Sequence, residues 1–329
     1  MIHYSLFTVH SPGAKGAGAS VPALTERHRG WYNTEKFFGG NPMEASNQRR
    51  FFWIAAAVWT VASFGLRFLI LHNSVVAHGR ILAGRSALLW TLILALAGLL
   101  LLWGLSGFFR KKPCTDRVFS RGGYWFILPL AGAVLLLIGN LPPVLALLRS
   151  FGKQSFDEAI RAIGKLQLLS ALFGLISALL MAAVLLRRSL LGKNAFWLQL
   201  PLILFTGTNM IRHFRAWSHD PIVLDIAPMA LSAICFLLAV VMISGFSVSV
   251  GRRRSTGIWC AMAVICTAMI LPDYLLGAKT DIYALLIWLG QALWCGFHGG
   301  MLLTEPDPAG NDAPIPAEEE VKADDSPLQ

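Results

Sequence analysis

Six polar side chains that could bind a charged solute lie at the ends of long apolar segments. They are Arg67, His72, Arg212, His213, Asp225 and Asp273. Polar groups inside a bilayer are costly and usually face the interior of a helix bundle or a water-filled cavity. We therefore predict a polar vestibule in which the two arginines bind an anionic group. The two aspartates would set its charge or carry a coupled proton, and pairing would reduce the cost of desolvating the arginines.

The same residues have a structural interpretation that requires no ligand. Each arginine could extend from the end of a helix to the lipid head groups, with Trp217 as an anchor at the membrane interface. The sequence leaves both interpretations open.

Metal and haem binding are not indicated. Histidines occur in pairs six residues apart, at His72 and His78 and again at His213 and His219, so no pair shares one helical face at a spacing of four. The five cysteines contain no CxxC pair, which favours small packing residues over a zinc site or a disulfide framework. We predict no metal site and no cofactor.

Catalytic motifs are also missing from the sequence. We find no phosphate-binding loop, no HExxH, no GxSxG and no kinase signature, and no soluble region large enough to house such a site. An intramembrane hydrolase would need a nucleophile beside a general acid or base, and no nucleophile can be identified. We assign no catalytic residue.

Long apolar runs must position the polar residues. The chain is 55% hydrophobic and 14% charged, and runs of about 20 apolar residues recur, the length that crosses a hydrocarbon core. Continuous rather than alternating apolar runs predict helices. The fold class is therefore all-α, a polytopic bundle of about eight spans. These spans are 51–71, 87–109, 124–148, 166–186, 196–212, 222–246, 257–276 and 282–303.

The basic residues predict the orientation of the bundle. Lysine and arginine concentrate in the amino-terminal tail and after the second, fourth and sixth spans, as in Arg110–Lys112, Arg187–Arg188 and Arg252–Arg254. By the positive-inside rule, both termini are cytoplasmic. A bacterial cytoplasmic membrane is the expected location. The net charge of +10 is spread between spans rather than along one soluble face, which argues against nucleic acid as a partner.

The two ends of the chain differ from the membrane domain at 51–304. Residues 1–50 form a predicted cytoplasmic tail, and the segment that starts at Met43 looks like the natural start of a membrane protein, so residues 1–42 could be untranslated. Residues 305–329 are rich in acids and prolines and predict a disordered tail, which could contact a cytoplasmic protein.

Two further patterns concern helix packing. Small residues recur every fourth position in the fourth span, at Ser170, Gly174, Ala178 and Ala182, and predict a close approach of a neighbouring helix; Gly296 and Gly300 have the same spacing in the eighth span.

The halves of the membrane domain show similar features in the same order. Phe52-Trp53 opens the first span and Phe196-Trp197 the fifth, while Asp157 precedes the fourth span and Asp281 the eighth. These matches suggest a parallel four-plus-four internal repeat.

Three functional classes fit these features. The first is a permease-like transporter for a small, anionic solute that enters through the vestibule. The second is a membrane-embedded sensor or assembly subunit that uses the acidic tail. The third, an intramembrane enzyme, ranks last because it lacks a nucleophile.

Overall fold

The structure is a computed structural model that describes residues 42–72, 75–77, 80–82, 85–108, 119, 126–150, 155–191, 195–218, 227–276 and 281–304. The chain separates into two compact units, Met1–Glu44 and Ala45–Gln329. Of the first unit only residues 42–44, the start of a helix, are described, and the account below concerns the second. The proposed start at Met43, the amino-terminal tail up to residue 41 and the acidic tail at 305–329 lie outside the described residues, so the predicted domain boundaries stay a prediction.

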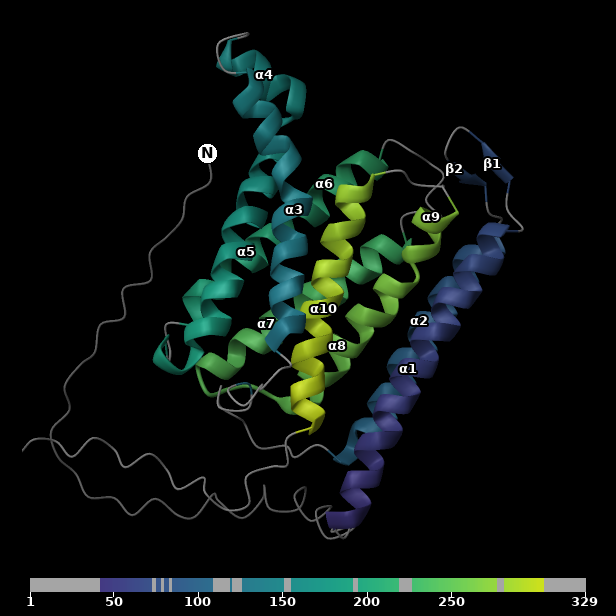
Figure 1. Cartoon of the computed structure of the whole chain (residues 1–329). Coiled ribbons are helices and arrows are strands. Elements are labelled where there is room, and N and C mark those ends of the chain that lie inside the picture. Colours follow the sequence, from purple (N-terminus) through teal and green to yellow (C-terminus); the bar gives the residue numbers. More distant parts are fainter. Residues whose placement is uncertain are drawn as a thin grey trace, which may run out of the picture. The chain divides into compact units, whose positions relative to one another are not determined.

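The described part of the membrane domain is helical apart from one small hairpin (Figure 1). Its elements are α1 (Pro42–His72), β1 (Val75–Ala77), β2 (Arg80–Leu82), α2 (Arg85–Leu105), the 3₁₀ turn η3 (Ser106–Phe108), α3 (Ile127–Ser150), α4 (Phe156–Ile163), α5 (Lys165–Leu191), α6 (Ala195–Ser218), α7 (Ala227–Ser247), α8 (Arg253–Ala268), α9 (Leu271–Leu275) and α10 (Ile282–Thr304). The strands pair antiparallel with Val76 opposite Ile81.

Six helical segments within the described residues are long and apolar enough to cross a membrane. They are Arg50–His72, Ile127–Ser150, Lys165–Leu185, Pro228–Ser247, Arg253–Leu275 and Ile282–Leu302. These segments correspond to six of the eight predicted spans, and they confirm a multi-pass helical membrane protein embedded in a lipid bilayer.

The second and fifth predicted spans fall on helices that do not meet this criterion. The apolar part of α2, Leu89–Leu105, is shorter. Helix α6 has 24 residues, but Gln199, Asn209 and Arg212 interrupt its apolar sequence. A total of eight spans therefore stays a prediction, as does the orientation.

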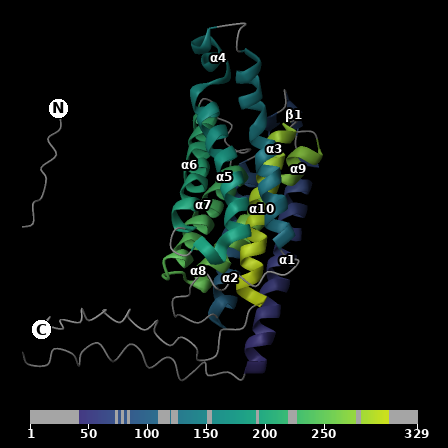
Figure 2. The same ribbon diagram turned by 60° about the vertical axis from the view of Figure 1, so that its left-hand side comes forward.

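Six helices pack in a closed series. Helix α10 packs on α3, α3 on α5, α5 on α6, α6 on α7, α7 on α8, and α8 returns to α10. Figure 1 shows α3 between α5 and α10, and Figure 2 shows the three helices running along one another. Helix α8 is central, since 67% of its span is buried by the rest of the chain, whereas 22% of the α1 span is buried. Helix α1 thus lies outside this series, and its buried residues Phe52 and Ala56 join the same hydrophobic core.

Small residues allow the closest helix contacts in this series. A Cβ atom on Gly290 of α10 would lie 2.7 Å from the carbonyl oxygen of Gly132 on α3, and one on Gly132 would lie 2.8 Å from that of Gly290. Because these neighbours are backbone atoms, they cannot move aside as a flexible side chain could. The α3–α10 contact therefore depends on both glycines.

The predicted small-residue stripe of the fourth span lies on α5. Gly174 faces the side chain of Asn140 on α3, Ser170 and Ala178 are buried, and Ala182 is partly buried. On α10 the closest backbone approach is at Gly290, which the sequence analysis did not select. Gly300 instead faces the ring of Trp53 on α1, and a Cβ on Gly296 would have only one ordinary contact, with Val264.

Two features of the fold were not predicted. The connection before the fourth span contains α4, which packs on α3 and α5, and the connection after the first span contains the β1–β2 hairpin. Both are too short to produce an apolar run of membrane length. The internal repeat is not shown: α7 packs along α8, whereas the corresponding helices α2 and α3 are not among the extensively packed pairs of the described residues.

Candidate functional site

Two opposite charges that are almost completely buried face each other in the described part of the membrane domain. The Nε of Arg67 on α1 donates to Asp273 Oδ1 at 2.9 Å, and its Nη2 donates to Asp273 Oδ2 at 3.1 Å. The two side chains are 3% and 0% exposed. This two-bond geometry satisfies both carboxylate oxygens and adds directional specificity to the attraction of the charges.

A break in the helix positions Asp273. Helix α8 ends at Ala268, and the short helix α9 begins with Pro272 in its first turn, where a missing N–H is tolerated. The backbone N–H of Asp273 donates to the carbonyl oxygen of Ile270 at 3.1 Å. The break thus places a carboxylate at the α8–α9 junction rather than on a continuous helical face.

One face of α1 brings Arg67 to this junction. Phe52, Ser63, Arg67 and Leu71 are buried and are separated by eleven, four and four residues, which places them on one side of the helix. The opposite side is exposed, with Val61 71% and Leu69 58% accessible. Because that side is apolar, it suits contact with lipid, and the charged residue points inward.

A second arginine lies near the pair. Tyr274, the neighbour of Asp273, lies within the electrostatic reach of Asp273, Asp281 and Arg212 of α6, and it packs against the cluster that contains Trp288 of α10. Asp281 is the main charged neighbour of Arg212. We call Arg67, Arg212, Asp273, Tyr274 and Asp281 the charge cluster. Its two arginines are balanced by its two aspartates.

Asp281 has a structural task as well. Its Oδ1 accepts hydrogen bonds from the backbone N–H groups of Tyr283 at 3.1 Å and Ala284 at 3.2 Å. This is the arrangement of an N-terminal helix cap on α10. From the sequence, Asp281 was identified only as a marker of the eighth span, and Tyr274 was not identified at all. An acid directly before an apolar helix is the sequence signal for Asp281.

The other predicted vestibule residues are not all brought together. His72 ends α1, is exposed, and its ring stacks on Phe68 with a centroid separation of 6.4 Å. His213 lies in α6, but its side chain is outside the described part, and Asp225 lies wholly outside it. Among the residues that the structure describes, no group of three or more His, Cys, Asp or Glu side chains could hold a metal ion.

Buried polar atoms without a hydrogen-bond partner in the structure occur one helical turn from both arginines. The hydroxyl of Ser63 lies four residues before Arg67 on α1, and Oδ1 of Asn209 lies three residues before Arg212 on α6. The Oε1 atom of Gln291 on α10 is a third such atom. Buried polar groups are normally hydrogen-bonded, and an exception calls for water, an ion or a ligand.

A separate polar contact joins the start of α8 to the end of α2 and the turn η3. Arg254 at the start of α8 donates to Ser106 Oγ at 2.9 Å and to the carbonyl oxygen of Trp103 at 3.0 Å, with its guanidinium 4.9 Å from the Trp103 ring centroid. His298 is fully buried near Phe119, Trp294 and Phe297, and its Nδ1 is 2.9 Å from the carbonyl oxygen of Trp294. We interpret these contacts as structural packing contacts.

Comparison with protein-family models, curated proteins and solved structures finds no match to this chain. The functional argument therefore depends on the charge cluster itself.

Proposed function

We propose that this chain is a permease-type transporter for a small carboxylate, and that the solute displaces Asp273 from Arg67. The single observation that supports this proposal is the buried two-bond ion pair. Asp273 presents a carboxylate to Arg67, so a solute carboxylate can make the same two hydrogen bonds in its place.

A purely structural role does not account well for the free-energy cost of burying two charges. Removing two charges from water costs several kcal/mol per ion, and well-packed apolar residues of similar volume often stabilise a fold equally well. Ionisable residues within membrane segments are accordingly uncommon and mark solute or ion pathways. The charge cluster is already neutral overall, so an anion binds to an arginine by competing with a carboxylate of the cluster. This competition couples binding of the anion to opening of the Arg67–Asp273 ion pair.

Helix α1 is suited to move when the pair opens. It lies outside the closed series of six helices, and two polar links to the rest of the chain are described along it. One is the ion pair at Arg67, and another is a hydrogen bond from Trp59 Nε1 to the carbonyl oxygen of Leu94 at 3.0 Å. Loss of the first link would free the end of α1 from α9, a displacement of the hinge type seen in transport proteins. The unpartnered polar atoms of Ser63 and Asn209 would then lie along the solute's route.

Binding can be tested with defined anions and three single variants. The thermal unfolding midpoint of the purified protein in detergent is measured with sodium acetate, lactate and succinate, and with phosphate and chloride as comparators. Carboxylates should stabilise the wild type by binding to Arg67. Arg67→Gln should lose this response. Asp273→Asn should respond at about a tenfold lower concentration, because no carboxylate competes for Arg67.

The control is Arg254→Gln, which removes an arginine from a contact distant in sequence and should leave the response unchanged. Equal responses of the wild type and Arg67→Gln would contradict the proposal. Uptake of the stabilising anion into proteoliposomes then separates the alternatives: binding without uptake would favour a membrane-embedded sensor over a transporter.

A further inference from the structure

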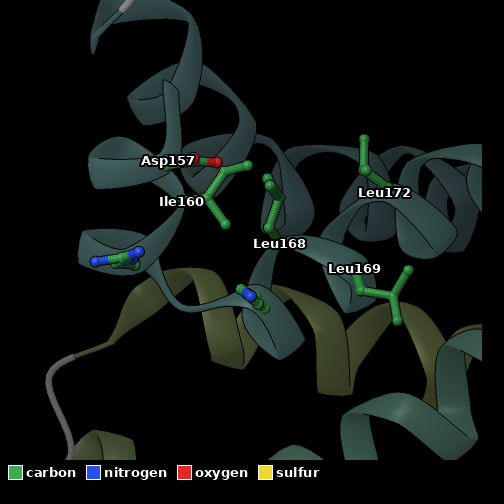
Figure 3. Close-up of a pocket in the computed structure, with 7 residues that line it drawn as sticks. Asp157, Ile160, Leu168, Leu169 and Leu172 are labelled. Atoms are coloured by element: carbon green, nitrogen blue, oxygen red, sulfur yellow. The ribbon is translucent and has the colours of Figure 1, made fainter. Parts of the chain in front are cut away.

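We infer that α4 and the first turns of α5 form a binding site for an anionic phospholipid of the phosphatidylglycerol type. A cavity of about 460 Å³ lies between these helices and is lined by Asp157, Ile160, Arg161, Lys165, Leu168, Leu169 and Leu172 (Figure 3). The site is separate from the charge cluster, and the inference does not rest on the proposed transport function.

A sharp turn folds α4 onto α5. Gly164 joins the two helices with a backbone φ of +93°, a conformation that side-chain-bearing residues rarely adopt. Helix α4 is amphipathic: Ala159 is buried, whereas Asp157, Glu158 and Arg161 are exposed. Figure 3 shows Ile160 of α4 beside Leu168 of α5, with Leu169 and Leu172 continuing along α5. The cavity is therefore apolar toward α5 and charged toward α4.

The position of the cavity relative to the hydrocarbon region suits a lipid head group. The candidate membrane span of α5 begins at Lys165, so the charged residues lie where the hydrocarbon region starts. Below them Leu169, Leu172, Ile176 and Leu179 follow the spacing of one helical face and remain 42–62% exposed. This face continues from the cavity for about three turns of helix and suits one acyl chain.

The charges of the cavity match an anionic head group. Arg161 and Lys165 supply two cations on the two sides of the Gly164 turn, and Asp157 supplies one carboxylate. None of the three forms an ion pair within the described part of the chain. A phosphodiester can bind between the two cations, and the carboxylate can accept hydrogen bonds from the hydroxyls of a glycerol head group. A net charge of +1 favours phosphatidylglycerol over the neutral phosphatidylcholine.

Native mass spectrometry of the full chain in detergent tests the site. The protein is titrated with phosphatidylglycerol, phosphatidylcholine or the soluble head group glycerophosphoglycerol. We expect one tightly bound phosphatidylglycerol and weaker binding of both other probes. The variant Arg161→Gln/Lys165→Gln should bind phosphatidylglycerol roughly thirtyfold more weakly, since each cation near a head group contributes about fivefold.

The control variant, Arg149→Gln/Arg215→Gln, removes the same charge from two exposed positions outside the cavity and should keep the bound lipid. All four positions are exposed, so the substitutions leave the fold intact, which the thermal unfolding midpoint verifies. Three outcomes would overturn the inference: equal loss in both variants, equal binding of the two lipids, or binding of the soluble head group as tight as that of the lipid.

Discussion

The ion pair between Arg67 and Asp273 leads to the sharpest prediction on stability. We consider Arg67→Gln and Asp273→Asn, singly and together, because both replacements keep a hydrogen-bonding amide and remove the charge. Two unit charges about 4 Å apart attract by about 4 kcal/mol at an effective dielectric constant of about 20. With the two side chains 3% and 0% exposed, solvent screens this attraction little.

Each single substitution leaves the other charge buried and unpaired, which costs about 3–5 kcal/mol of unfolding free energy. The double variant leaves no unpaired charge, so it should cost no more than either single variant. The coupling energy between the two positions is then at least about 3 kcal/mol. A titration with sodium dodecyl sulfate in mixed micelles, followed by circular dichroism, measures the three unfolding free energies.

The assay remains informative if a single variant is too unstable to purify, because the double variant should then recover the yield. Additivity of the two single effects within about 0.5 kcal/mol would refute the reasoning. Such a result would mean that the two charges do not stabilise each other, and the charge cluster would lose its basis.

Three further predictions concern packing. Gly290→Ala should destabilise the fold by about 1–3 kcal/mol, because its Cβ would meet the carbonyl oxygen of Gly132, whereas Gly65→Ala meets nothing within 4 Å and should be neutral or stabilising in the same titration. Trp59→Phe removes the hydrogen bond to the carbonyl oxygen of Leu94 and should cost about 1 kcal/mol; an unchanged midpoint would contradict that bond. Four buried cysteines should resist maleimide in the folded protein and react fully in dodecyl sulfate, namely Cys235, Cys260, Cys266 and Cys295. Peptide mass spectrometry measures the labelling, and rapid labelling of any of them in the folded state would contradict their burial.

The helices follow closely from the sequence because hydrophobic length is a local property. The predicted spans at 282–303 and 196–212 correspond to α10, Ile282–Thr304, and α6, Ala195–Ser218, which extends six residues beyond the predicted end. Helix α4 was missed because eight residues cannot form an apolar run of membrane length. The amphipathic pattern of α4 predicts a packed helix only when the position of α5 is known, because α4 packs against α5.

The pairing of charges could be predicted less well. Arg67 and Asp273 were both selected because they are ionisable groups at the ends of apolar runs, but 206 residues separate them and no local pattern specifies which acid meets which base. Asp281 was not selected as a site residue, because an aspartate directly before a helix is explained by its role as an N-terminal cap without reference to its charge. The contact of Gly290 with Gly132 depends on the α3–α10 register, which composition does not encode.

The proposed position of the charge cluster requires that Asp273 and the residues around Val250 lie on opposite sides of the membrane. Single cysteines at Leu275 and Val250, which are 69% and 62% exposed, can be introduced into a variant without native cysteines. Membrane-impermeant maleimide is then applied to right-side-out and inside-out vesicles. We predict that Leu275→Cys reacts in right-side-out vesicles and Val250→Cys only in inside-out vesicles. Labelling of both from the same side would show that the α8–α9 segment does not cross the bilayer, and would contradict the proposed position of the charge cluster.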